Sequence, residues 1–117
     1  VEYHPFLNQQ PVLSEARRLG LFLTAYCPLA KGRAPGDPTL QAIGEKHGKT
    51  AAQVALRWLI QHGDVAAIPK ASSIEHAEAN FDIFDFQLDQ GELARIAQLP
   101  GGTRIINPSW APQWDAA

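Results

Sequence analysis

The chain has 117 residues, of which 45% are hydrophobic and 19% are charged, as in a globular domain and unlike a disordered chain. Its net charge of -2 gives no electrostatic basis for binding nucleic acid or an anionic membrane, and no apolar run approaches the roughly 20 residues that span a bilayer. The single cysteine, Cys27, cannot form an internal disulfide, so a cytoplasmic location is the default expectation.

The first residues read as the end of a strand rather than as the start of a protein. Val1 is not an initiator methionine, and VEY runs directly into His4-Pro5. The charged, apolar and small-residue regions of a signal peptide do not precede it. We therefore expect the chain to be a fragment, or to lack part of its N-terminal sequence.

Strands and helices alternate along the rest of the chain. Apolar runs predict strands over 1–3, 21–27 and 65–69. Helical spacing, capping residues and glycine stops predict helices over 10–19, 38–47, 51–62, 73–81 and 89–99. The strand LFLTAYC (21–27) is apolar or β-branched almost throughout, which is typical of a strand buried on both faces. The tail over 100–117 is rich in Trp, Pro and Gly, and we expect it to be irregular and to bury its tryptophans.

This alternation predicts an α/β fold with parallel strands and crossover helices. Three strands make a poor closed sheet, and the outer neighbours that a buried strand requires do not occur in the chain. Eight such strand and helix units occupy about 250 residues in a (β/α) barrel. We therefore expect part of a larger (β/α) barrel.

Polar and aromatic residues follow each predicted strand, where barrels of this kind carry their chemistry. The three places are Glu2-Tyr3-His4, Tyr26 to Leu29, and Lys70 to Ser73. His4 fits a general acid or a residue that caps and packs. The ring of Tyr26 fits a flat ligand or the filling of the barrel mouth, and its neighbour Cys27 fits a small buried residue.

The stretch IPKASSIEHAEAN (68–80) places a cation and hydroxyl groups where a strand gives way to a helix. Lys70, Ser72 or Ser73, and the N-terminus of the following helix together suit an anion, most naturally a phosphate. The alternative is that a serine only caps the helix and Lys70 is solvated, and spacing alone favours it. The histidines lack metal-ligand spacing, and no glycine-rich phosphate loop is present.

Three stretches, VEYHPFLNQ, LFLTAYCPLAKG and IPKASSIEHAEANFDIFDFQL, in this order and spacing, resemble the C-terminal part of aldo-keto reductases. The resemblance covers essentially residues 1–117. The tail pattern R-x-x-N-P-x-x-A-P-x-W-D, from Arg104 to Asp115, is similar to the bacterial branch that reduces 2,5-diketo-D-gluconate and methylglyoxal-type carbonyls.

The resemblance implies a (β/α)8 TIM barrel of which this chain supplies strands 6–8 and their helices. The strands over 1–3, 21–26 and 65–68 would be the sixth, seventh and eighth. Family members bind NADPH without a Rossmann domain and transfer its hydride to an aldehyde or ketone. Their catalytic tyrosine, lysine, aspartate and histidine belong to the first half of the barrel, so the resemblance places no catalytic residue in this chain.

The same resemblance assigns cofactor contacts to individual positions. Tyr26 would stack on the nicotinamide, and Asn80 would bind the adenine. The pyrophosphate contacts fall at Cys27, Leu29 and Lys31, and the contacts to the adenosine 2′-phosphate at Lys70, Ala71, Ser72 and His76. No metal site is implied.

Three positions depart from the family pattern. Cys27 and Ala71 stand where serine is common, and His76 stands where most relatives carry an arginine that clamps the 2′-phosphate. Arginine is a permanent bidentate cation, whereas histidine is largely neutral at pH 7. We therefore expect weaker discrimination against NADH, so the cofactor is NADPH with NADH as a second candidate. Glu78, close to the same pocket, points the same way or only faces solvent.

In the tail, Trp110 and Trp114 resemble the C-terminal substrate loop that this family closes over its substrate; packing on the barrel wall is the alternative. Two functions follow. The first is the cofactor-binding part of an NADPH-dependent carbonyl reductase, with a small carbonyl substrate and the N-terminal half of the barrel as partners. The second is a non-catalytic half-barrel module that self-associates to cover its hydrophobic edge.

Overall fold

The computed structural model describes residues 1–102 and 104–114. The helices are α1 (Gln10–Arg18), α2 (Pro38–His47), α3 (Ala51–Gln61), α4 (Ile74–Phe81) and α5 (Gln90–Ala97), with a short 3₁₀ turn η1 (Ala30–Gly32). The strands are β1 (Leu23–Ala25) and β2 (Val65–Ala67). Every predicted helix is confirmed to within two residues at each end, whereas the strands are shorter than predicted.

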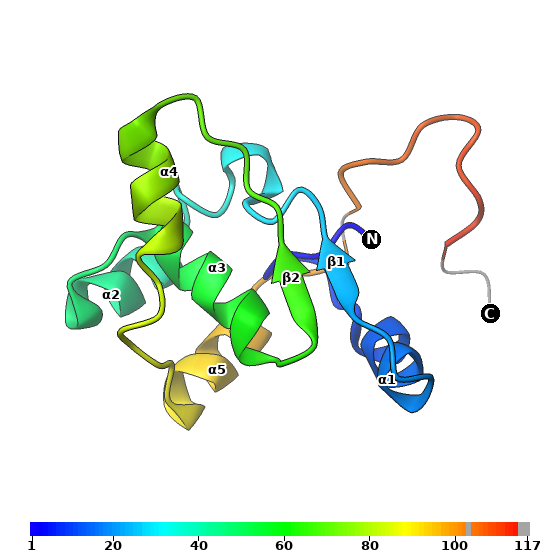
Figure 1. Ribbon diagram of the computed structural model, residues 1–117, viewed down its shortest axis with the longest axis horizontal. Coiled ribbons are helices and arrows are strands. Elements are labelled where there is room, and N and C mark those ends of the chain that lie inside the picture. The colour runs from blue at the N-terminus through cyan, green and yellow to red at the C-terminus, as the bar shows by residue number, and fades with distance from the viewer. Residues whose placement is uncertain (103, 115–117) are drawn as a thin grey trace.

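The strands are parallel neighbours, as the alternating pattern predicted. Leu23 pairs with Val65 and Ala25 with Ala67, so β1 and β2 end at the same edge. On the other side of β1, Glu2 forms an isolated parallel bridge with Tyr26. The first residues, β1 and β2 therefore lie side by side in chain order, with α3 beside β2 and α1 below β1, where it shares an apolar cluster with that strand (Figure 1).

The prediction that the strand over 21–27 is buried on both faces is wrong for this structure. Leu23 and Ala25 are buried, whereas Thr24 between them is exposed and Phe22 is 76% exposed. The buried face packs on α1 and α3. One apolar cluster on that face contains Tyr3, Leu13, Ala16, Leu23, Ala25, Leu59 and Val65. The other face receives no comparable cover from the described part of the chain, so the strand alternates in burial.

A second apolar cluster lies between α2, α3 and α5 and includes Leu40, Ile43, Val54, Leu88 and Ile96. Capped helix starts support the helices around it. The Asp37 carboxylate accepts the Leu40 N–H at 3.0 Å at the start of α2, and Thr50 forms a reciprocal capping box with Gln53 at the start of α3. Both caps satisfy N–H groups that a helix start leaves unpaired.

A buried carboxylate fastens α5 to α2. Glu92 is 4% exposed and accepts hydrogen bonds from Lys46 Nζ at 2.9 Å and from His47 Nε2 at 2.8 Å. Burial by itself would raise the pKa of Glu92, but the hydrogen bonds from Lys46 and His47 outweigh it and the pKa is lowered. The carboxylate therefore stays ionised, and the two helices are held by charge-assisted bonds.

Candidate functional site

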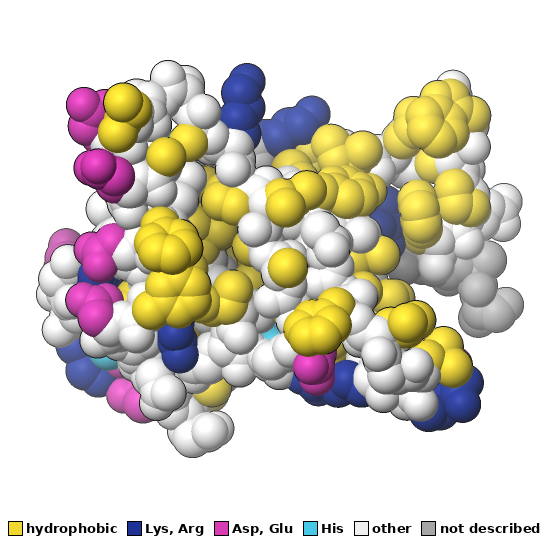
Figure 2. Space-filling model, viewed as in Figure 1, with side chains coloured by type: hydrophobic (Ala, Val, Ile, Leu, Met, Phe, Trp, Pro, Cys, Tyr) yellow, Lys and Arg dark blue, Asp and Glu magenta, His cyan; other side chains and the backbone are white. Residues whose placement is uncertain are grey.

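Two loops that carry the predicted cofactor residues leave the same edge of the sheet. Tyr26 follows β1 directly, and Lys70 follows β2 after Ile68 and Pro69. The two strand ends are joined where the Ile68 N–H donates to the Ala25 carbonyl at 3.2 Å. Figure 1 shows both loops rising from the arrowheads, and Figure 2 shows Lys and Arg side chains projecting at that end. The structure therefore brings Tyr26 and Lys70 to one edge.

The loop after β1 has an unusual backbone that the sequence did not indicate. Cys27, Ala30 and Lys31 have φ values of 54°, 52° and 50°, in the left-handed region that costs a non-glycine residue roughly 1–2 kcal/mol. Hydrogen bonds close the loop: the Ala30 N–H donates to the Cys27 carbonyl at 3.0 Å, and the Ala34 N–H donates to the Leu29 carbonyl at 3.2 Å. Such clustered strain is characteristic of ligand-binding loops.

The start of α4 shows which of the two serines caps the helix. Ser73 Oγ accepts the His76 N–H at 3.1 Å, so Ser73 caps the helix as the alternative reading proposed. Lys70, Ser72 and His76 are all exposed. The cap uses one N–H of the first turn, and it leaves the Lys70 and Ser72 side chains facing solvent, where they are available to an anion.

Ala71 and Asn80 line a shared pocket of about 410 Å³ between α3, β2 and α4. The remaining lining is mostly apolar, and two of its residues, Phe81 and Phe84, are 75% and 64% exposed. Their rings meet edge to face, with centroids 5.2 Å apart. Figure 2 shows hydrophobic side chains gathered between α4 and β2. This apolar face therefore lies beside the outer edge of β2.

The tail is irregular over 104–114, as predicted, but its tryptophans are not buried. Trp110 is 84% exposed and Trp114 is 45% exposed, because no described element packs over them. The Arg104 guanidinium lies 4.6 Å from the centre of the Trp114 ring, which folds the tail back on itself. Asp115, the last residue of the tail pattern, lies outside the described residues. The role of these residues as a substrate loop stays a prediction.

Glu2 and His4 are completely buried, and the sequence alone indicates no separate role for Glu2. His4 Nδ1 accepts the Phe6 N–H at 3.2 Å, so Nε2 carries the proton and donates to Glu2 Oε1 at 2.9 Å. Burial lowers the pKa of His4, although Glu2 opposes that effect. His4 therefore caps and packs, the second of its two interpretations.

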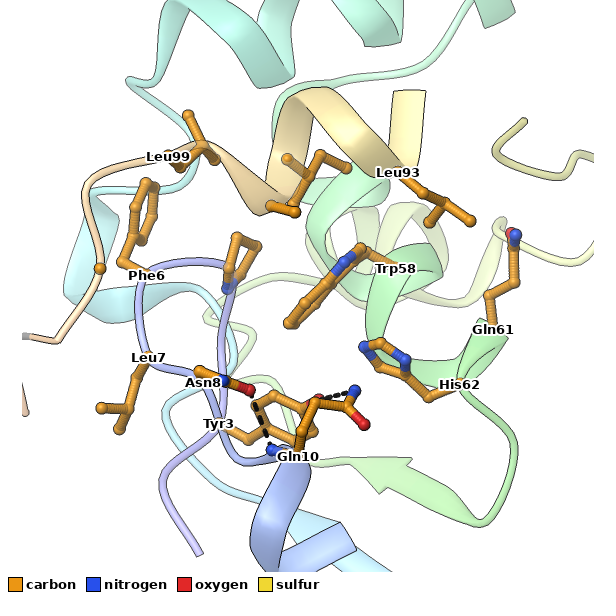
Figure 3. A pocket seen from close by; sticks show the side chains of 14 residues that line it. Tyr3, Phe6, Leu7, Asn8, Gln10, Trp58, Gln61, His62, Leu93 and Leu99 are labelled. Atoms are coloured by element: carbon orange, nitrogen blue, oxygen red, sulfur yellow. Dashed lines mark hydrogen bonds between the residues drawn. The ribbon is translucent and has the colours of Figure 1, made fainter. Parts of the chain in front are cut away.

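A separate pocket of about 390 Å³ lies on the helical side of the sheet, between α1, α3 and α5. Trp58 and His62 meet edge to face with centroids 4.6 Å apart, and Tyr3 stacks on His62 at 5.6 Å (Figure 3). Burial raises the pKa of Tyr3 to about 12 and lowers that of His62. None of the predicted cofactor residues lines this pocket, so it is distinct from the strand-end site.

Within residues 1–102 and 104–114, no three His, Cys, Asp or Glu side chains are grouped closely enough to hold a metal ion. No helix in that same part of the chain has the length and apolar character required to cross a membrane.

Comparison with known proteins shows where such an arrangement occurs. An aldo-keto reductase of Mycolicibacterium smegmatis is 42% identical over 105 residues, which cover 90% of this chain and 38% of the relative. Morphine 6-dehydrogenase of Pseudomonas putida is 38% identical, covering 90% of this chain and 40% of that protein. The chain therefore spans less than half the length of these relatives.

Solved structures agree with the sequence matches. A putative 2,5-diketo-D-gluconic acid reductase B is 50% identical, with a TM-score of 0.93 over 99% of this chain and 42% of its own. A mutant of Gox0644 in complex with NADPH is 34% identical, with a TM-score of 0.79 over 84% of this chain and 36% of its own. These neighbours are aldo-keto reductases, which are (β/α)8 barrels. The aldo/keto reductase family model matches residues 1–100, and the chain belongs to the aldo/keto reductase family.

Proposed function

We propose that this chain is the C-terminal, cofactor-binding part of an NADPH-dependent aldo-keto reductase that reduces aldehydes and ketones to alcohols. In this proposal the first residues, β1 and β2 are strands 6–8 of the barrel, and the tail is its substrate loop. A 50% identical neighbour described as a putative 2,5-diketo-D-gluconic acid reductase B supports a substrate of that kind or a methylglyoxal-like carbonyl. The NADPH complex of a second neighbour supports the cofactor.

One observation carries the proposal: the strained loop over 27–31 and the segment over 70–80 follow two paired parallel strands at one edge. Enzymes built on parallel α/β sheets bind ligands beyond the carboxyl ends of their strands. A long dinucleotide requires contacts from more than one strand end. The positions of the two loops satisfy that requirement within this chain.

Each part of the site has a task that its chemistry suits. Tyr26 would stack on the nicotinamide, while Cys27, Leu29 and Lys31 on the strained loop would hold the pyrophosphate. Bound NADPH supplies the hydride that reduces a carbonyl carbon. The residues proposed here bind and orient that cofactor, and the proton donor belongs to the preceding half of the barrel. We therefore expect no carbonyl reductase activity from the 117-residue chain alone.

The adenosine end would be held at α4. Lys70 and Ser72 are exposed beside the helix start, and Ala71 and Asn80 line the adjacent pocket. Lys70 provides a cation for the 2′-phosphate, and the backbone N–H groups and dipole of the helix start favour the same negative charge. His76, exposed in the first turn of α4, is a weaker phosphate ligand than an arginine would be.

Replacing Lys70 in the full-length protein tests this assignment. A charge-assisted hydrogen bond contributes roughly 1.5–3 kcal/mol, so Lys70→Ala is expected to weaken NADPH binding by roughly 10- to 150-fold. NADH lacks the 2′-phosphate, and its Kd should change by less than about threefold. Arg95→Ala removes an exposed cation from α5 as the matched control. Equal losses for both nucleotides, or no loss, would contradict the assignment.

The apolar face beside β2 favours a second candidate, the self-associating half-barrel. Phe81, Phe84 and Ile68 are 75%, 64% and 57% exposed, next to a strand edge that invites pairing. In the reductase the N-terminal half of the barrel would cover this face. Sedimentation of the 117-residue chain distinguishes the two: a stable dimer that Phe84→Asp dissociates supports the module, and a monomer excludes it.

A further inference from the structure

A buried carboxylate joins the beginning of the chain to its end. Glu2 is 0% exposed, and its two oxygens accept the backbone N–H groups of Ile105 and Ile106, each at 2.7 Å. These partners lie 103 and 104 residues further along the chain. The tail is therefore attached to the first strand segment through a defined pair of hydrogen bonds, and we refer to Glu2 with Ile105 and Ile106 as the tail anchor.

Both oxygens of the Glu2 carboxylate accept hydrogen bonds in the tail anchor. His4 Nε2 donates a third hydrogen bond to Oε1 at 2.9 Å. Burial would raise the pKa of Glu2, but the Ile105, Ile106 and His4 hydrogen bonds outweigh it and the pKa is lowered. An ionised carboxylate is costly to bury unless donors surround it. The folded chain therefore strongly favours the arrangement in which the tail supplies its two N–H groups.

The position of the anchor connects it to the candidate site. Glu2 is the bridge partner of Tyr26, and the Tyr26 N–H donates to the Val1 carbonyl at 2.9 Å while the Tyr3 N–H donates to the Tyr26 carbonyl at 3.3 Å. Paired residues on parallel strands project to the same face of a sheet. The carboxylate that holds the tail and the ring proposed to face the nicotinamide thus belong to one rung and one face.

The anchor also limits where the tail can go. Trp110 lies four residues beyond Ile106, a distance of roughly 14 Å at full extension. Arg104, directly before the anchor, lies over the Trp114 ring at 4.6 Å. The exposed Trp110 and the partly exposed Trp114 are therefore tethered within reach of the strand ends, although no helix or strand holds them.

We propose that Glu2 is a positioning residue that sets substrate specificity by fixing the tail, and with it Trp110 and Trp114, beside the strand-end site. The inference rests on the proposed function, since it concerns a carbonyl substrate held between the tail and the cofactor. Glu2 touches neither ligand itself. Glu2 acts through the apolar surface that Trp110 and Trp114 present to the substrate. A bulky carbonyl substrate contacts this surface more than a small aldehyde does.

The first experiment tests the tail anchor without an enzyme activity assay. Trypsin cleaves after Arg104, next to the anchored N–H groups, and amide exchange at Ile105 and Ile106 reports their opening. Glu2→Gln replaces one acceptor oxygen by a donor, and we expect exchange and cleavage there to accelerate roughly tenfold or more. Glu45→Gln, at an exposed glutamate of α2, is the matched control and should leave both rates unchanged. Unchanged rates in folded Glu2→Gln would overturn the anchor.

A second pair of variants acts from the tail, so that a folding defect at Glu2 does not decide the outcome. Ile106→Pro removes the N–H that Glu2 Oε2 accepts, whereas Ile106→Ala keeps it and shortens the side chain. We expect Ile106→Pro, but not Ile106→Ala, to reproduce the faster cleavage after Arg104. Equal behaviour of the two variants would show that side-chain packing, not the carboxylate, holds the tail.

The second experiment uses the full-length reductase with a bulky and a small carbonyl substrate. Glu2→Gln is expected to raise KM for the bulky substrate roughly tenfold, with KM for the small aldehyde and Kd for NADPH changed less than about twofold. If the tail is released but the discrimination between the bulky and the small substrate is unchanged, the specificity role is overturned and Glu2 has only a structural role. Failure of the parent protein to reduce any carbonyl would refute the proposed function and this role together, while trypsin cleavage still decides the anchor independently.

Discussion

The replacement Gly44→Ala should destabilise the protein, although it removes a glycine from the middle of α2. In an exposed helix interior, Gly→Ala is favourable by about 1 kcal/mol because alanine has the higher helix propensity. Here the chain folds back over the helix: the Lys49 N–H donates to the Gly44 carbonyl at 2.8 Å. A Cβ built at Gly44 would lie 2.3 Å from the Lys49 carbonyl oxygen and 3.2 Å from its carbon.

The magnitude follows from that overlap. A carbon in contact with a carbonyl oxygen normally lies about 3.3 Å from it, so the new methyl group would overlap a backbone atom by about 1 Å. Backbone cannot rotate away as a side chain can, and the turn between α2 and α3 is fixed by the Thr50 capping box. We take about 3 kcal/mol, the upper end of overpacking costs. Subtracting the propensity gain leaves a net loss of about 2 kcal/mol.

Urea unfolding followed by circular dichroism measures this difference. With m near about 2 kcal/mol/M, Gly44→Ala should lower the midpoint by about 1 M. Gly91→Ala, in the exposed first turn of α5, is the matched helix glycine, since its nearest neighbour is a side-chain oxygen of Asp89 at 3.3 Å. That control should change stability by less than about 0.5 kcal/mol. A Gly44→Ala protein as stable as the parent would refute the close approach.

Two further predictions concern titration and cofactor choice. Burial raises the pKa of Tyr3 from 10.0 to about 12, so its contribution to stability is complete below pH 10 and is lost as the pH rises towards 12. Urea unfolding at pH 9 and at pH 11 measures how much stability each protein loses between these two pH values. The loss should be smaller for Tyr3→Phe than for the parent, and an identical loss would contradict the assignment. His76→Arg should increase the NADPH to NADH ratio of kcat/KM at least roughly tenfold in the full-length protein, because a permanent cation would face the 2′-phosphate. An unchanged ratio would argue against His76 lying at that phosphate.

The helices, their caps and the parallel direction of the strands could be predicted from the amino-acid pattern. Asp37-Pro38 and Thr50 predict the starts of α2 and α3, and both residues cap these helices in the structure. These features depend on contacts within three or four residues, which a linear pattern records. The alternation of strands and helices likewise implied parallel strands, and the stretches around Tyr26 and Lys70 carried the family resemblance that the comparisons confirm.

The contacts between residues that are not close in the sequence pattern became visible only in the folded chain. The Glu2 carboxylate accepts hydrogen bonds from N–H groups more than 100 residues away. Gly44 lies under a carbonyl of the next turn. Trp110 is exposed, although the composition of the tail predicts that its tryptophans are buried. The left-handed backbone of Cys27, Ala30 and Lys31 occurs without glycine. The Glu2 contact and the exposure of Trp110 depend on how distant segments of the chain meet. The Gly44 contact and the left-handed loop depend on tight turns whose backbone geometry overrides the preference of a single residue.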